Sequence, residues 1–205
     1  MVLVEKSTWV ITLLKRVGGF IKHYWRDYGF LFLVSGTLLA LDQWTKALVR
    51  RDIPLGSDWL PAGMEWLLPY ARIRHWYNTG AAFGFFKDGN LLFTAVAIIV
   101  LIAIFYYFPR IARDDFWLRI ALALQTTGAA GNLVDRLQYK HVTDFISVGD
   151  FAIFNIADAS ITVGVGVLLL DIWIKERAIK KHQQESLKAH TQVMVDQSNT
   201  PGEDK

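Results

Sequence analysis

The fold is decided by residues 126–158, which read TTGAAGNLVDRLQYKHVTDFISVGDFAIFNIAD. Two apolar segments meet in this stretch, and each carries an aspartate, Asp135 and Asp158, at a depth where lipid disfavours charge. An ionisable side chain inside a hydrophobic span is costly, which makes it a candidate functional residue. Each aspartate follows an asparagine by three residues, Asn132 and Asn155, and residues at this spacing share a helix face. The pattern therefore predicts two carboxylates, each with an amide beside it.

The composition is that of a small membrane protein. The chain has 205 residues, of which 53% are hydrophobic and 20% charged, and the charged residues are clustered. This pattern suits a multi-span membrane protein better than a soluble domain. The absence of cysteine excludes disulfides, a thiol nucleophile and cysteine-ligated metal. A net charge of +3 does not favour nucleic acid as a partner.

Four apolar segments predict a membrane all-α protein, a four-helix transmembrane bundle. They run over Tyr28–Val49, Leu91–Phe108, Phe116–Asp135 and Ile153–Ile174. Each has about 18 to 22 residues, enough to cross about 30 Å of hydrocarbon at 1.5 Å per residue. Basic residues in the N-terminal arm, the turn 109–115 and the C-terminal tail predict that both termini are cytoplasmic, although the connection after the first span is basic too.

Three regions flank or interrupt the four-span domain, residues 28–174. Residues 1–27 have apolar side chains at helical spacing, which predicts an N-terminal amphipathic helix that lies in the membrane interface or packs on the protein. Residues 51–90 contain several prolines and glycines and are rich in aromatic and β-branched residues, which predicts short strands. Residues 175–205 are polar and charged, and predict a short helix that frays into a partly disordered cytoplasmic tail.

Two further motifs admit more than one interpretation. Asp42 and Lys46 are four residues apart, acid first, which favours an ion pair on a helix. The pair either fixes the helix end or acts at the site. Residues 77–86 place small residues and Asn78 between aromatics. This suits either a turn with an aromatic belt at the lipid boundary or a platform whose backbone approaches an apolar ligand.

The third and fourth spans are antiparallel and joined by a loop, residues 138–152, so Asp135 and Asp158 are expected at the same depth near the outer face. Two adjacent carboxylates cannot both ionise cheaply and share a proton. This is the arrangement with which an aspartic protease activates water. Asn132 and Asn155 would orient the carboxylates. A cation- or proton-coupled transporter and a scaffold whose aspartates only fix helix ends are the alternatives.

Five blocks of sequence, taken together and in order, resemble the bacterial lipoprotein signal peptidase family, signal peptidase II. The blocks are LDQWTK (41–46), NTGAAFG (78–84), GAAGNLVDR (128–136), VTDF (142–145) and FNIAD (154–158). One departure is Thr127, where a second glycine is usual before Gly128. The resemblance implies a membrane aspartic endopeptidase with a small periplasmic β-rich cradle, which removes the signal peptide from diacylglyceryl-modified prolipoproteins by cleaving before the lipidated cysteine.

The same resemblance assigns residues and partners. It implies Asp135 and Asp158 as catalytic, and the positions that support the site or contact substrate as Asp42, Lys46, Asn78, Gly128, Asn132, Arg136, Asp144 and Asn155. It implies no metal and no cofactor, contact with membrane lipid, and inhibition by the cyclic peptide globomycin. It places the protein in the bacterial inner membrane with its active site near the periplasmic face. We expect a monomer.

Overall fold

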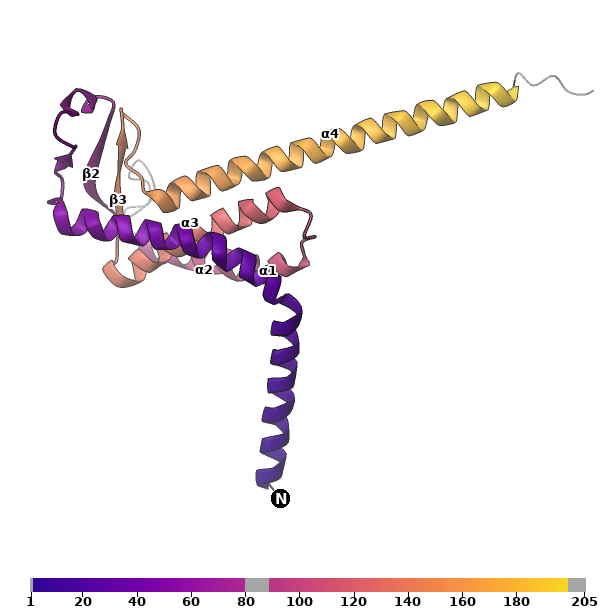
Figure 1. Cartoon of the computed structure of the whole chain (residues 1–205), viewed down its shortest axis with the longest axis horizontal. Coiled ribbons are helices and arrows are strands. Elements are labelled where there is room, and N and C mark those ends of the chain that lie inside the picture. Colours follow the sequence, from indigo (N-terminus) through magenta and orange to yellow (C-terminus); the bar gives the residue numbers. More distant parts are fainter. Residues whose placement is uncertain (1, 80–88, 199–205) are drawn as a thin grey trace, which may run out of the picture.

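The structure, a computed structural model, describes residues 2–79 and 89–198, with side chains for residues 24–79 and 89–188. Long helices make up most of the described chain (Figure 1): α1 (Val2–Asp52), α2 (Asn90–Tyr107), α3 (Phe116–Tyr139) and α4 (Ile156–Ser198). Three strands, β1 (Asp58–Trp59), β2 (Ala71–Asn78) and β3 (Val142–Val148), form one antiparallel sheet in the order β1-β2-β3. Two short 3-10 helices, η1 (Glu65–Leu67) and η3 (Phe108–Arg110), connect these elements.

The two outer helices are longer than the sequence pattern predicts. Residues 1–27 and the first span were predicted as separate helices, but α1 is one helix of 51 residues whose N-terminal part leaves the bundle at a steep angle (Figure 1). The apolar face predicted for residues 1–27 falls mostly on side chains outside the described range. α4 continues as helix to Ser198 and projects beyond the bundle, because helix-forming residues and pairs such as Glu176–Lys180 support it.

Two of the helices have the apolar character of membrane spans. Among the described residues, Asn90–Arg110 and Ile156–Lys188 are long and apolar enough to cross a membrane, by length and composition. α1 and α3 are less apolar because their inner faces carry charged and amide side chains, such as Asp42, Lys46 and Asp135. The prediction of four transmembrane helices therefore rests on α1 and α3, and it stays a prediction.

α3 is the central helix, and it contacts α1, α2 and α4. Its contact with α4 depends on small residues, since a Cβ atom on Gly128 would lie 2.5 Å from the Ala157 carbonyl oxygen and closer still to the Ile161 side chain. A Cβ atom on Gly131 would lie 2.7 Å from an Asp42 carboxylate oxygen and 3.0 Å from the Ala157 Cβ. Backbones that approach this closely are typical of helix packing in membranes.

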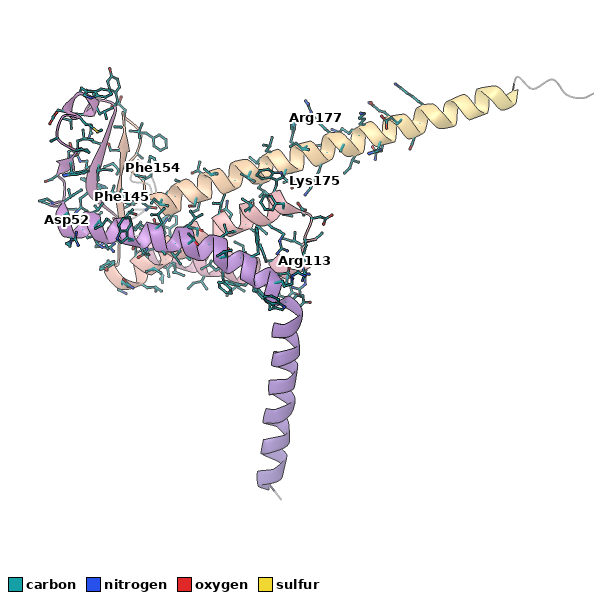
Figure 2. All side chains as sticks on the ribbon, viewed as in Figure 1. Asp52, Arg113, Phe145, Phe154, Lys175 and Arg177 are labelled. Carbon is teal, nitrogen blue, oxygen red and sulfur yellow. The ribbon has the colours of Figure 1, made fainter. Side chains whose placement is uncertain are left out.

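The two ends of the bundle are held differently. At the end that contains the turn 109–115, Asp27 pairs with Arg113 at 2.9 Å and with Arg119 at 3.0 Å, and Lys175 pairs with Asp115 at 2.7 Å. Figure 2 shows Arg113 and Lys175 at this end, far from Asp52 and Phe145 at the other. At the Phe145 end, which we call the sheet end, apolar residues bury the junction of α1 and β3; they are Val49, Ile53 and Phe145.

The sheet combines two parts of the chain. β1 and β2 come from residues 51–90, where strands were predicted, but β3 comes from residues 138–152, which were predicted as a loop. The segment forms a strand because it pairs with β2, from Ala71 opposite Val148 to Asn78 opposite Val142. This pairing is remote in sequence, and the loop prediction did not include it.

We expect Gly128→Ala to lower the free energy of unfolding by about 2 kcal/mol, because the added methyl group overpacks the α3–α4 contact. Thermal or denaturant unfolding of the purified protein measures the change. Gly166→Ala on α4 is the matched control, since nothing lies within 4 Å of its added Cβ atom. A helical glycine in open space gains about 0.4 to 1 kcal/mol on change to alanine. Equal effects in the two variants would contradict the packing role of Gly128.

Candidate active site

Polar side chains from α1, α3, β3 and α4 converge at the sheet end of the bundle. The first group is a buried ion-pair network centred on Lys46. Its ammonium nitrogen lies 2.9 Å from Asp42 Oδ2, 3.4 Å from Asp135 Oδ2 and 3.2 Å from the Asn132 side-chain oxygen. Asp42, Lys46 and Asp135 are fully buried, and Arg50 adds a second cation 3.5 Å from Asp135 Oδ1. Buried charges are tolerated when they are paired in this way.

The two carboxylates of this network also hold the backbone of neighbouring elements. Asp42 Oδ1 accepts a hydrogen bond of 2.9 Å from the Ala157 N–H, and so satisfies a donor in the first turn of α4. Asp135 Oδ2 accepts one of 2.9 Å from the Thr143 N–H in β3. Gln43 donates to Asp42 Oδ2 at 3.1 Å and to Asp135 Oδ1 at 3.3 Å. The Asp42–Lys46 pair therefore does more than end its own helix, because it joins α1 to α3 and α4.

The second group consists of Asp144 and Asp158, which share one asparagine. The Asn155 side-chain amide donates to Asp144 Oδ1 at 2.7 Å, while its backbone N–H donates to Asp158 Oδ2 at 3.2 Å. Asn78 donates to Asp144 Oδ2 at 2.9 Å, and Asn132 donates to Asp158 Oδ1 at 2.7 Å. Within the described residues, the ion pairs include Asp42 and Asp135 but neither of these two carboxylates. Their hydrogen-bond donors are neutral amides.

Asp144 has the electrostatic environment of a proton-exchanging group. Burial, together with the nearby negative charge of Asp158, raises the pKa of the Asp144 carboxyl to about 7, although hydrogen bonds from Asn78 and Asn155 oppose the shift. A carboxyl with a pKa near neutrality exchanges protons readily under physiological conditions.

A cavity of about 500 Å³ opens beside this second group. Asn78, Asn132 and Asp158 line it, and the Arg136 guanidinium lies at its wall 5.3 Å from the centre of the Phe93 ring. The remaining lining is mostly apolar and comes from residues 151–154, from α4 and from Val142; neither Asp135 nor Asp144 is among the lining residues. A pocket with a polar wall and an apolar wall suits a ligand that has both characters.

Most of the residues predicted from the sequence gather here. The sequence predicts that Asp135 shares a water with Asp158, and this pairing stays a prediction; in the structure the Asp135 carboxylate is paired with Lys46 and accepts a hydrogen bond from the Thr143 N–H. Asp144, predicted only as a supporting residue, shares Asn155 with Asp158. Gly128 lies in the α3–α4 contact. The region 80–86 of the second sequence block lies outside the described residues.

Three residues of the site were missed by sequence reasoning: Gln43, Arg50 and Thr143. Gln43 contacts Asp135 and Arg50 contacts Thr143 at sequence separations of 92 and 93 residues, and Thr143 also bonds to Asp135, 8 residues before it. The local signals were the positions of Gln43 inside the LDQWTK block and of Thr143 inside the VTDF block.

Comparison with known proteins places this fold among bacterial membrane enzymes. A solved structure titled as a bacterial membrane enzyme at 2.3 Å resolution is 31% identical, has a TM-score of 0.66, and is matched over 72% of this chain and 90% of that chain. A second, at 1.9 Å resolution, is 32% identical with a TM-score of 0.62, over 70% of this chain and 92% of that chain.

The family is defined by sequence. A family model described as signal peptidase (SPase) II matches residues 34–174, and the chain belongs to that family. The lipoprotein signal peptidase of Shouchella clausii is 41% identical over 73% of this chain and 97% of that protein, and that of Pseudomonas fluorescens is 40% identical over 71% and 87%. The chain is therefore an enzyme, an aspartic peptidase, and a membrane protein; this removes the transporter and scaffold alternatives.

We expect Lys46→Met to destabilise the protein by about 3 to 5 kcal/mol, because it leaves two buried carboxylates without their shared cation. Unfolding of the purified variant measures the loss. Lys180→Met is the matched control: that lysine is exposed and pairs with Glu176, and such a pair contributes about 0 to 1 kcal/mol. Wild-type stability in Lys46→Met would contradict the role of the network.

The raised pKa of Asp144 predicts a pH dependence of stability. The folded value of about 7 lies above the usual 3.8, so the folded state binds the proton more tightly than the unfolded chain. The stabilisation is complete below pH 3.8 and is lost as the pH rises through about 7. Unfolding measured between pH 5 and about 7.5 should show stability falling with pH, by at most about 1.4 kcal/mol per unit for one proton. Asp144→Asn should flatten this slope, and an unchanged slope would contradict the assignment.

Proposed function

We propose that this enzyme removes the signal peptide from diacylglyceryl-modified prolipoproteins by cleaving before the lipidated cysteine, and that Asp144 and Asp158 activate the attacking water. The observation that carries the proposal is the pair of amide-held carboxylates joined by Asn155 beside the cavity. The names of the relatives, lipoprotein signal peptidases, support the choice of substrate.

The choice of Asp144 over Asp135 rests on the partners of each carboxylate. The sequence-based prediction paired Asp135 with Asp158, and that pairing is now the second candidate. Asp135 is paired with Lys46 and Arg50, and two of its hydrogen bonds hold β3 and Gln43. A carboxylate whose oxygens are already held by two cations and by backbone suits a structural role. Among the described residues, the side-chain donors to Asp144 are the amides of Asn78 and Asn155, and its pKa is near 7, which suits acid–base chemistry.

The mechanism follows from two carboxyl groups that hold one proton between them. The ionised carboxylate takes a proton from the water as its oxygen attacks the scissile carbonyl carbon. The protonated carboxyl donates its proton to the carbonyl oxygen, so that a neutral tetrahedral diol forms. When the C–N bond breaks, a proton passes to the leaving amine and the carboxyl pair returns to its starting state. Asn78, Asn132 and Asn155 keep the two carboxyl groups oriented throughout.

The setting of the site suits a lipidated substrate. In this proposal α1 to α4 all cross the bacterial inner membrane, both termini are cytoplasmic, and the sheet end faces the periplasm. The charged and aromatic residues around 109–115 then lie at the cytoplasmic surface, where basic residues are favoured. The apolar wall of the cavity, which includes Phe93, Ile161 and Val163, would accept acyl or signal-peptide side chains, and globomycin would compete for the same space.

We expect Asp144→Asn and Asp158→Asn each to lower kcat by at least about 1000-fold, because each removes a proton carrier. Asp135→Asn should lose less, about 10-fold, and should lower the unfolding temperature because Lys46 loses a partner. Cleavage of a purified lipidated prolipoprotein in detergent, followed by gel shift, measures all three variants. High activity in Asp144→Asn with an inactive but folded Asp135→Asn would return the catalytic role to Asp135.

A further inference from the structure

The pairing of β2 with the strand that carries Asp144 is irregular next to that residue, and the extra residue belongs to β2. In the β2–β3 pairing, Ile73 lies opposite Ile146 and Trp76 opposite Asp144, so two residues of β2 face the single residue Phe145 of β3. Such a bulge interrupts the hydrogen-bond ladder and redirects nearby side chains. The pairing of the strands alone therefore does not fix the direction of the Asp144 carboxylate.

The preceding residue, Thr143, lies opposite Tyr77 of β2 and is also held from outside the sheet. Its N–H donates to Asp135 Oδ2 at 2.9 Å, and its carbonyl oxygen accepts from the Asn155 amide at 3.4 Å. Its hydroxyl oxygen accepts a hydrogen bond of 3.0 Å from Nη1 of Arg50. Thr143 is fully buried, so these contacts are not exchanged for contacts with bulk water.

Arg50 is itself held in a fixed plane. Its guanidinium carbon lies 4.4 Å from the centre of the Tyr139 ring, at the end of α3, and Nη1 lies 3.5 Å from Asp135 Oδ1. Stacking on the ring and donation at the edge are two contacts that a planar guanidinium makes at once and an ammonium does not. The side chain is 17% exposed, in contrast to 71% for its neighbour Arg51, which pairs with the adjacent Asp52.

We propose that Arg50 is a positioning residue for the cleavage reaction: it clamps Thr143 between α1 and α3 and thereby sets the direction of Asp144. The inference rests on the proposed catalytic role of Asp144. Arg50 does not line the cavity, so its effect on the reaction passes through Thr143 rather than through contact with substrate. A displacement of a catalytic group by about 1 Å lowers the rate by about 100-fold.

The test compares kcat and KM for a lipidated prolipoprotein. Arg50→Gln and Arg50→Lys should each lower kcat by about 10- to 100-fold, with KM changed less than about twofold. Thr143→Val, which loses only the hydroxyl acceptor, should lower kcat similarly, and Thr143→Ser should retain activity. Because the two residues act in one path, Arg50→Gln combined with Thr143→Val should be no worse than the poorer single variant. Arg51→Gln is the matched control and should behave as wild type.

Specific outcomes overturn the proposal. Wild-type kcat in folded Arg50→Gln or in Thr143→Val would refute it, and so would losses that multiply in the double variant. A loss confined to KM would indicate a role in binding instead. If Arg50→Gln does not fold, the isosteric Thr143→Val still decides the question. Asp144→Asn in the same assay separates the two proposals: an active Asp144→Asn refutes the catalytic role, whereas an inactive one with fully active Arg50→Gln refutes only the clamp.

Discussion

The sheet end of the molecule depends on one buried ammonium group. Lys46 pairs with Asp42 and Asp135, and these carboxylates in turn bond to backbone N–H groups of α4 and β3. Through these two carboxylates, the Lys46 ammonium links α1 and α3 to α4 and β3. Because these charges are fully buried, removal of one partner leaves the others uncompensated in a low-dielectric environment and destabilises the protein. Everything that surrounds the cavity is placed relative to this network.

In the proposed mechanism the same residue type serves two purposes because it lies in two environments. Asp42 and Asp135 lie beside cations and accept hydrogen bonds from backbone N–H groups. Asp144 and Asp158 are held by Asn78, Asn132 and Asn155, whose amides orient a carboxyl group without supplying a full charge. Environments that separate the behaviour of chemically identical groups are a general feature of acid–base catalysis. Here the separation occurs within a few residues, since Asp135 bonds to the N–H of Thr143, next to Asp144.

Local pattern predicted the helices well and the site only in part. The apolar runs that became α2 and α3 were recognised almost to their ends, and the pairing of Asp158 with Asn155 followed from spacing in the sequence, whereas spacing assigned Asn132 to Asp135 and the structure shows it donating to Asp158. The sequence did not indicate whether Asp135 or Asp144 is the better candidate for the partner of Asp158. Both aspartates lie in conspicuous motifs, and they differ only in the partners that the fold brings to them. Those partners come from Lys46 and from β3. The pairing of β3 with β2 joins residues some 70 positions apart, so no local periodicity of the sequence reveals it. The continuity of α1 was missed because charge near residue 27 resembles a boundary, whereas Asp27 is paired with Arg113 and Arg119.

The surroundings of Ala157 bear on how the enzyme can evade an inhibitor. This residue is fully buried, its N–H is bonded to Asp42, its carbonyl faces Gly128, and its methyl group faces Gly131. It directly precedes Asp158, so the backbone beneath that carboxyl group is enclosed on every side by atoms that are already in contact. A compound whose affinity comes from this inner part of the pocket therefore meets a surface that single amino-acid replacements cannot reshape without disrupting the protein. Resistance would have to arise from the outer wall of the cavity, where exposed side chains such as Val163 have room to vary.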